Sequence, residues 1–282
     1  MTESDDTNGP AAEVSSEDHP RLTLLIPAYN EALRITASLR EMDAYLAGRP
    51  YTSEILIVDD GSQDETSAVA REAAMGLSTP VRFLGYTPNR GKGYALKVGF
   101  EAARGEQILF TDSDLSTPIR EVDRLLEKLD AGFEMVIGTR KSAQAVIAVH
   151  QPKFRELMGK AFTFLVRRML IDVSDVTCGF KAFDAKVGKN LFGLSRVHDW
   201  SFDAEILFLA KKQGRRLVEV PVYWEDQPGT KVSMLRDGLM AFIGLLRIRG
   251  YSLLGRYAAL NPLGEYGERW STNLDGRGGK PA

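Results

Sequence analysis

The chain of 282 residues is 44% hydrophobic and 26% charged, a composition typical of a globular protein with one large or two small domains. Its formal net charge of -2 gives no reason to expect a nucleic-acid partner. The single cysteine, Cys178, excludes an intrachain disulfide framework and a cysteine-rich metal site, and is typical of a cytoplasmic protein.

The two ends of the chain differ in composition from the region between them. Residues 1–19 are acidic and polar, which predicts a disordered tail and no signal peptide. Residues 261–282 are polar and rich in glycine, which predicts a flexible tail. Between the tails we expect a folded domain over residues 20–235 and an amphipathic helical region over residues 236–260. No run approaches the roughly 18 apolar residues of a membrane-spanning helix.

Short apolar runs alternate with segments of helical periodicity from residue 21 to residue 137. The first run, residues 22–26, predicts a buried strand that ends at Pro27. The other predicted strands are residues 54–58, 81–84, 107–110 and 134–137. The predicted helices between them are residues 34–46, 65–75, 94–103 and 122–129. This alternation predicts an α/β fold with a Rossmann-like, doubly wound, mostly parallel sheet.

The second half of the chain is less periodic. Residues 154–170 predict a basic amphipathic helix, residues 204–212 a further helix, and residues 234–257 a C-terminal helical region. Residues 177–183 predict a strand. Residues 217–223 predict another, and Pro221 within it indicates an edge strand, because proline cannot donate a ladder hydrogen bond.

Polar residues follow each of the five predicted strands. They are Tyr29, Asn30 and Glu31, then residues 59–62, 89–93 and 112–114, and finally Thr139 and Arg140. Open α/β sheets bind ligands outside the carboxyl ends of their strands. We therefore expect these segments to meet at one rim and to form a binding site there.

Asp112 and Asp114 lie two residues apart just after an apolar strand. If the chain stayed extended, both carboxylates would leave on one face, which suits a cation that prefers oxygen ligands. Mg²⁺ or Mn²⁺ held by one or two carboxylates and by substrate phosphates is the usual arrangement. The alternative is turn and cap chemistry before Pro118. The pair alone leaves both open, and the other strand ends favour the metal site.

Two further segments of the rim have alternative interpretations. Asp59 and Asp60 could bind a base or ribose, or could build an Asx turn and a helix cap, and we expect one acid for each role. Residues 89–93 are glycine-rich and basic, as a loop near phosphates should be. They lack the spacing of a P-loop, however, which argues against an ATPase.

Seven basic residues lie between Arg140 and Arg168. A guanidinium at the end of a strand can grip phosphate oxygens. The predicted helix over residues 154–170 interleaves its cations with apolar side chains, which favours either core packing or a surface for an anionic lipid substrate. The three histidines lack metal-binding spacing, and Cys178 lacks a catalytic signature, so nothing supports a covalent nucleophile.

Several motifs together resemble the family 2 glycosyltransferases of the GT-A fold. They are PAYNE at residues 27–31, VDDGS at 58–62, GKG at 91–93 and DSD at 112–114. IGTR at 137–140, CGFK at 178–181, EVP at 219–221 and GTK at 229–231 are similar to the dolichyl- or polyprenyl-phosphate sugar synthases. DLSTP at 114–118 is most similar to the dolichyl-phosphate β-glucosyltransferase branch. The resemblance covers residues 21 to 240.

The resemblance implies an inverting enzyme that moves a hexose, most simply glucose from UDP-glucose, to polyprenyl or dolichyl phosphate. It implies Mg²⁺ or Mn²⁺ held by Asp112 and Asp114, and lipid phosphate held by Arg140 and Arg155. The donor-binding residues that it implies are Pro27, Tyr29, Glu31, Asp60, Lys92, Ser113 and Lys231, the last on a loop that closes over the donor. Two positions depart from the family: Ser113 stands where alanine is common, and Ser116 where related synthases carry glutamine.

Family members often carry a transmembrane segment, and in its place residues 236–257 mix apolar side chains with arginines. We expect a peripheral helix at the cytoplasmic face of the membrane; a core helix or a contact between copies in a homo-oligomer is the alternative.

Three other functions stay open: transfer from GDP-mannose, transfer to a soluble acceptor such as glycerate or a saccharide, and a non-catalytic nucleotide-binding module.

Overall fold

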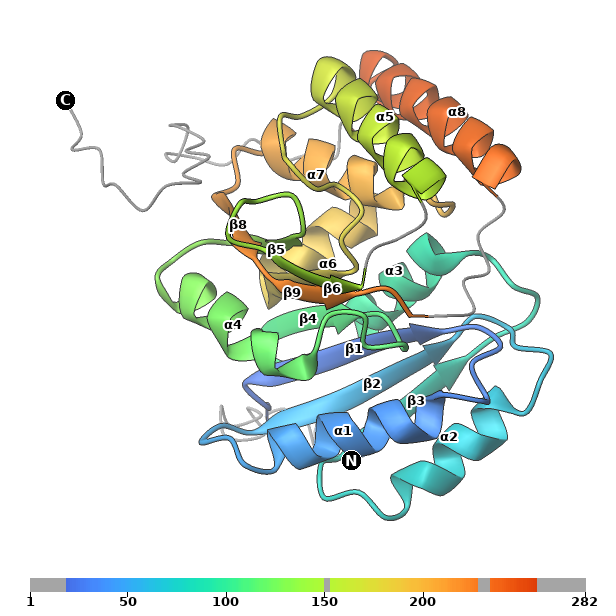
Figure 1. The fold of residues 1–282 in the computed structure, drawn as a ribbon, viewed down its shortest axis with the longest axis vertical. Helices are drawn as coiled ribbons and strands as arrows, with labels where there is room; N and C mark the ends of the chain where they lie inside the picture. Colours follow the sequence, from blue (N-terminus) through green and yellow to red (C-terminus); the bar gives the residue numbers. More distant parts are fainter. Residues whose placement is uncertain (1–18, 150–152, 228–233, 258–282) are drawn as a thin grey trace, which may run out of the picture.

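A seven-stranded sheet forms the centre of the protein in the computed structural model, which describes residues 19–149, 153–227 and 234–257 (Figure 1). The strand order is β3-β2-β1-β4-β7-β5-β8, and every strand is parallel to its neighbours except β7. Their bounds are β1 Leu22–Ala28, β2 Ser53–Asp59, β3 Val81–Gly85, β4 Gln107–Thr111, β5 Met135–Thr139, β7 Phe180–Asp184 and β8 Leu217–Pro221. The predicted α/β class and mostly parallel sheet are confirmed.

Helices cover both faces of this sheet. The face bearing Leu24 packs against α1 (Ile35–Leu46), α2 (Thr66–Ala74) and α4 (Val122–Asp130). The face bearing Leu25 packs against α3 (Lys92–Ala102), α6 (Ala185–Leu194) and α7 (Phe202–Lys212). Because alternate residues of β1 are buried on opposite faces, the strand reads as one continuous apolar run.

The proline positions partly confirm the predicted strand boundaries. Pro27 does not end β1, which continues to Ala28. It lies beyond Leu25, where the pairing with β4 stops, so its missing N–H is tolerated. Pro221 does lie on an edge strand, β8, as predicted. After it the chain forms β9 (Tyr223–Glu225), which pairs with β6 (Val146–Val149) in a small second sheet.

Three elements differ from the sequence prediction. The strand predicted over residues 177–183 begins only at Phe180, and residues 177–179 form an irregular loop. Helix α6 was not predicted; the Asp184 carboxylate caps it by accepting a hydrogen bond from Val187 N at 3.1 Å. The strand β6 was not predicted either, because its residues 146–149 are mostly exposed and pair only with the short β9.

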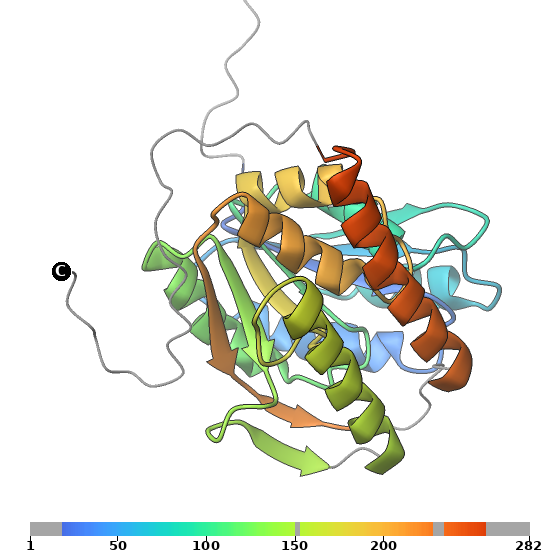
Figure 2. The ribbon, with the colours of Figure 1, turned by 90° about the horizontal axis from the view of Figure 1, so that it is seen from above.

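The predicted basic helix is α5 (Lys153–Met169), and it lies beside the C-terminal helix α8 (Met234–Leu253) at the periphery of the molecule (Figures 1 and 2). Leu245 and Ile248 of α8 are fully buried, so one face of α8 is a core face. Phe242 and Leu246 are 39% and 50% exposed, so the other face presents apolar side chains to solvent. In the described part of the chain, no helix has the length and apolarity that crossing a membrane would require.

A cluster of phenylalanines lies between the sheet and α6. The Phe100 ring stacks on Phe192 with centroids 4.0 Å apart and meets Phe183 edge-on at 5.1 Å. We expect Phe100→Ala to lower the free energy of unfolding by about 3–5 kcal/mol, because it leaves a cavity in this cluster. Denaturant unfolding measures the loss. As a control, Phe164→Ala should change stability by about 0.5 kcal/mol or less, since Phe164 is 67% exposed.

Candidate active site at the carboxyl edge of the sheet

The loops that follow β1 and β2 are joined into one unit. Asn30 N donates to Ser62 Oγ at 2.9 Å, and Gln63 N donates to Asn30 Oδ1 at 2.8 Å. Glu31 N donates to Thr66 Oγ1 at 2.6 Å. Asn30 has a φ of +54°, a conformation that asparagine tolerates better than most residues. The predicted donor residues Tyr29 and Glu31 therefore stand on a loop that is fixed by its neighbour.

Asp60 organises the loop that follows β3. Its side chain is buried, and its two carboxylate oxygens accept hydrogen bonds from Tyr86, Asn89, Arg90 and Gly91 at 2.8–2.9 Å. Asp59 makes the expected turn, since its Oδ1 accepts from Ser62 N at 2.8 Å. Both acids thus have structural partners, and the contact of Asp60 with a base or ribose stays a prediction.

The two glycines beside Lys92 are required by close packing. Gly91 has a φ of +96°, and a Cβ there would lie 2.5 Å from the carbonyl oxygen of His198. A Cβ on Gly93 would lie 2.7 Å from Phe202 Cβ. These contacts press the start of α3 against the start of α7, and they bring the Lys92 ammonium onto the carboxylate of Asp112.

The segment after β4 is a turn and not the extended chain on which the paired-carboxylate argument relied. Ser113 and Asp114 form the turn, Leu115 has a φ of +51°, and Asp114 Oδ1 accepts from Ser116 N at 3.0 Å. The Ser113 carbonyl accepts from Ser38 Oγ at 2.6 Å, and this hydrogen bond connects the turn to α1. A left-handed residue other than glycine is uncommon and often marks a functional site.

The electrostatics of this turn favour a cation. Burial, together with the nearby charge of Asp112, raises the pKa of Asp114. Burial opposes the charge of Lys92, but the carboxylates of Asp112, Asp203 and Asp114 together outweigh this and raise the pKa of Lys92. Two neighbouring carboxylates, one of them mostly buried, are a donor set that Mg²⁺ or Mn²⁺ would stabilise. No third His, Cys, Asp or Glu completes the set within the described ranges, so other ligands would come from substrate phosphates and water.

A buried ion pair that the sequence did not reveal fixes the loop that contacts Asp112. Lys181 is 1% exposed, and its Nζ donates to Asp203 Oδ1 and to the carbonyl oxygen of Cys178, both at 2.5 Å. The loop held in this way places Gly179 against Asp112, the predicted metal ligand: a Cβ at residue 179 would lie 1.9 Å from Asp112 Oδ2. Only glycine leaves room for the carboxylate.

Arg140 directly follows β5 on the same edge of the sheet, and part of its guanidinium is already engaged. Nε and Nη2 donate to the two oxygens of the fully buried Asp175 at 2.7 and 2.8 Å, and Nη2 also donates to Thr177 Oγ1. Although burial opposes its charge, the Arg140 guanidinium holds the pKa of Asp175 well below its usual range. Nη1 has no hydrogen-bond partner among the residues described, so it is available to a phosphate oxygen.

The remaining predicted residues differ in what the structure says of them. Pro27 lies in β1 at the same edge. Arg155 lies in the first turn of α5, where its backbone but not its side chain is described. Lys231 lies outside the described residues. The residues that the sequence analysis missed are Asp175, Lys181 and Asp203, of which only Lys181 belonged to a quoted motif.

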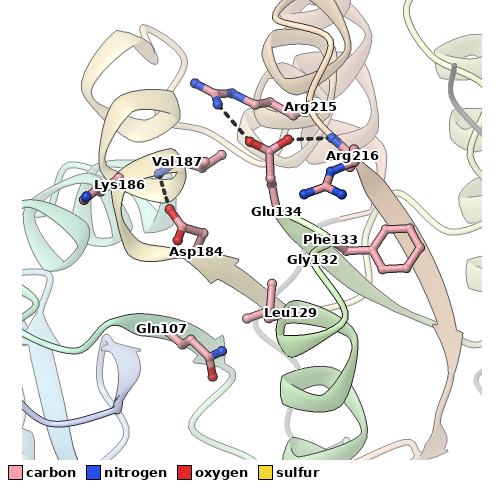
Figure 3. A pocket seen from close by; sticks show the side chains of 10 residues that line it. All are labelled: Gln107, Leu129, Gly132, Phe133, Glu134, Asp184, Lys186, Val187, Arg215 and Arg216. Carbon is pink, nitrogen blue, oxygen red and sulfur yellow. Dashed lines mark hydrogen bonds and ion pairs between the residues drawn. The ribbon is translucent and has the colours of Figure 1, made fainter. Parts of the chain in front are cut away.

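A separate cavity of about 360 Å³ lies at the opposite edge of the sheet (Figure 3). Gln107 begins β4 there, and Glu134 precedes β5. Arg215 Nη1 donates to Glu134 Oε1 at 2.9 Å, and Arg216 N donates to Glu134 Oε2 at 2.8 Å. Asp184 accepts from Val187 N at 3.1 Å, so both acids of this cavity already have partners, and the cavity is remote from the carboxyl edge.

Comparison with known proteins places this chain in a family. The family model of glycosyl transferase family 2 matches residues 23–192. The chain is 36% identical to the dolichyl-phosphate beta-glucosyltransferase of Drosophila melanogaster, over 78% of this chain and 72% of that protein. It is 31% identical to the human protein of the same name, over 84% and 77%. The chain therefore belongs to glycosyl transferase family 2 and is an enzyme of that class.

Solved structures agree on the fold. The chain superposes on glucosyl-3-phosphoglycerate synthase from Mycobacterium tuberculosis in complex with UDP with a TM-score of 0.64. The match covers 82% of this chain and 80% of that one at 19% identity. Another structure of that synthase contains Mn²⁺, UDP-glucose and phosphoglyceric acid, with a TM-score of 0.62. At this identity the likeness extends to the fold alone, which is the GT-A arrangement expected from the sequence.

The contact between Gly179 and Asp112 gives a test of the metal site. Gly179→Ala should displace the Asp112 carboxylate and weaken Mn²⁺ binding by about 10- to 100-fold, measured by titration calorimetry in the presence of UDP. Gly193→Ala is the matched control, because no atom lies within 4 Å of a Cβ at that position. Unchanged Mn²⁺ affinity in Gly179→Ala, with Asp112 visibly displaced, would contradict a role of Asp112 in metal binding.

Proposed function

We propose that this protein is a metal-dependent, inverting glycosyltransferase that moves glucose from UDP-glucose to polyprenyl or dolichyl phosphate. The observation that carries the proposal is the meeting of the Asp112–Asp114 turn, Lys92 and Arg140 at one edge of the sheet. The names of the curated relatives support both the sugar and the lipid acceptor. GDP-mannose as donor is the alternative, and comparing transfer from the two donors decides between them.

Each group has a role that its surroundings favour. Asp112 and Asp114 would hold Mg²⁺ or Mn²⁺, which would stabilise the charge of the departing diphosphate. Lys92, whose ammonium already contacts Asp112, would turn to the donor phosphates when the metal neutralises that acid. Pro27, Tyr29, Glu31, Asp60 and Ser113 would line the nucleotide pocket, and Lys231 would close over it.

On the acceptor side, Arg140 and Arg155 would hold the lipid phosphate. The phosphate monoester is already an anion, so its attack on the anomeric carbon needs no strong general base. One displacement breaks the bond from that carbon to the donor diphosphate and inverts its configuration. Arg140 suits the task because its bidentate pair with Asp175 fixes the direction of Nη1.

We also propose that the enzyme works at the cytoplasmic face of a membrane, where its acceptor would lie. The supporting feature is the exposed face of α8, where Phe242 and Leu246 neighbour Arg247 and Arg249. Such a mixture favours an interfacial helix. The opposite, buried face of α8 shows that this helix is also part of the core. A homo-oligomer stays a prediction.

Asp114→Asn tests the reaction. With UDP-glucose, polyprenyl phosphate and Mg²⁺, the unmodified enzyme should form lipid-linked glucose, and Asp114→Asn should lower kcat by about 100-fold or more, because a neutral amide binds the metal weakly. Thin-layer separation of labelled lipid measures the product. Product from GDP-mannose but not from UDP-glucose would contradict the proposed donor, and full activity of Asp114→Asn would contradict the proposed metal site.

Arg155→Gln tests the acceptor site. The expected result is a roughly tenfold rise in KM for polyprenyl phosphate, the loss of about one charge-assisted hydrogen bond, with an unchanged KM for UDP-glucose. Lys186→Gln removes the same charge at the opposite edge of the sheet and should alter neither constant. Equal effects of the two substitutions, or none from Arg155→Gln, would place the lipid phosphate elsewhere.

A further inference from the structure

An open cavity of about 650 Å³ lies between α5, Lys141 and the segment that follows α5, which contributes Asp172 and Ser174. Its lining includes four cations, Lys141, Lys160, Arg167 and Arg168, and a single acid, Asp172. A volume of this order is within the range of small-ligand sites. The cavity therefore combines space for a ligand with an excess of positive charge.

The ion pairs around the cavity leave part of this charge unbalanced. Arg167 Nε pairs with Asp172 at 2.5 Å, and Lys160 pairs with Glu156 at 2.6 Å. Arg168 has no ion pair within the described part of the chain. Among the described residues, Lys141 Nζ has one hydrogen-bond partner, the neutral hydroxyl of Thr163 at 2.6 Å. Within that part of the structure, two cations thus line the cavity without an ion pair.

The surroundings of Lys141 favour a bound anion. Desolvation by the surrounding protein, with the positive charges of Arg140 and Lys160, lowers the pKa of Lys141 in spite of the nearby acids Asp175 and Glu219. An anion in the cavity would offset both the lost hydration and the repulsion between the cations. Among biological anions, a phosphate offers several oxygens to a divergent set of ammonium and guanidinium donors.

Apolar side chains lie on the same face of α5 as the cations. Leu157, Lys160, Phe164 and Arg168 follow one another at intervals of three and four residues, which places them along one helical stripe. Leu157 and Phe164 are 61% and 67% exposed. A free phosphate would leave these two apolar side chains in water, whereas the acyl chains of a phospholipid would cover both.

The position of the cavity fits a membrane surface. Lys141 directly follows Arg140, the proposed acceptor residue, and α5 lies at the periphery beside α8, whose exposed face is also apolar and basic (Figures 1 and 2). We propose that this cavity binds the phosphate headgroup of an anionic membrane lipid, with Leu157 and Phe164 against its acyl chains. The inference deepens the proposed function, since it concerns how the enzyme is seated beside its lipid acceptor.

Vesicle binding without donor, metal or polyprenyl phosphate tests this site. The double variant Lys160→Gln/Arg168→Gln should bind vesicles of phosphatidylcholine with phosphatidic acid about 30-fold more weakly than the unmodified protein, from the usual contribution of two cations near such a surface. Lys186→Gln/Arg216→Gln removes the same charge at the opposite edge and should stay within about threefold. Equal loss in both pairs would mean general charge attraction and would overturn the proposal.

Two further arms separate the sources of the phosphate and the two proposals. Saturable binding of glycerol 3-phosphate, abolished in Lys160→Gln/Arg168→Gln, would assign the cavity to a free phosphate ester and overturn the lipid assignment. Phe164→Ser should weaken vesicle binding with no change of charge, and an unchanged value would equally count against a lipid. Transfer to short-chain polyprenyl phosphate, measured on the same variants, should be unchanged, so the proposed reaction stands or falls on its own measurement.

Discussion

The like charges of Asp112 and Asp114 are the constraint around which the carboxyl edge is built. Placing two carboxylates in one turn is unfavourable, and burying one of them adds to the cost. The protein offsets this with the Lys92 ammonium, which contacts Asp112 directly. Lys92 can do so because glycines on either side let the start of α3 approach α7 closely. The turn is thus held in a state that a divalent cation would stabilise further.

The antiparallel strand β7 is what brings the second half of the chain to this edge. It lies between β4 and β5, and Phe180 pairs with Thr111, so the start of β7 faces the end of β4. Gly179 therefore lies against Asp112. Lys181, the second residue of β7, binds Asp203 in the interior. If β7 were parallel to its neighbours, its carboxyl end would lie at this edge. The loop before it, with Gly179, would then lie at the opposite edge of the sheet.

The sequence predicts what is local and misses what is paired over long distances. Alternating apolar runs and polar strand ends were enough to predict the parallel strands and the rim, because sheet geometry alone places those ends together. The direction of β7 and the pair of Lys181 with Asp203, 22 residues apart, depend on tertiary packing that no short motif encodes. For the same reason, the sequence predicted a phosphate-gripping role for Arg140 but not that two of its three guanidinium nitrogens are bound to Asp175.

The cations of β5, α5 and the loops beside them divide into two kinds by their burial. The Arg140 side chain is 17% exposed and fixed by Asp175, so a phosphate that meets Nη1 encounters a donor whose direction is already set. The Lys160 and Arg167 side chains are more than half exposed, and screening by salt and water makes each contact weak. Exposed, weakly interacting cations mainly attract and orient a partner. A rigid, buried cation fixes the position of the bound phosphate. An enzyme with the proposed lipid acceptor would need both, because a precisely held phosphate contributes nothing until the protein is bound to the membrane that contains it.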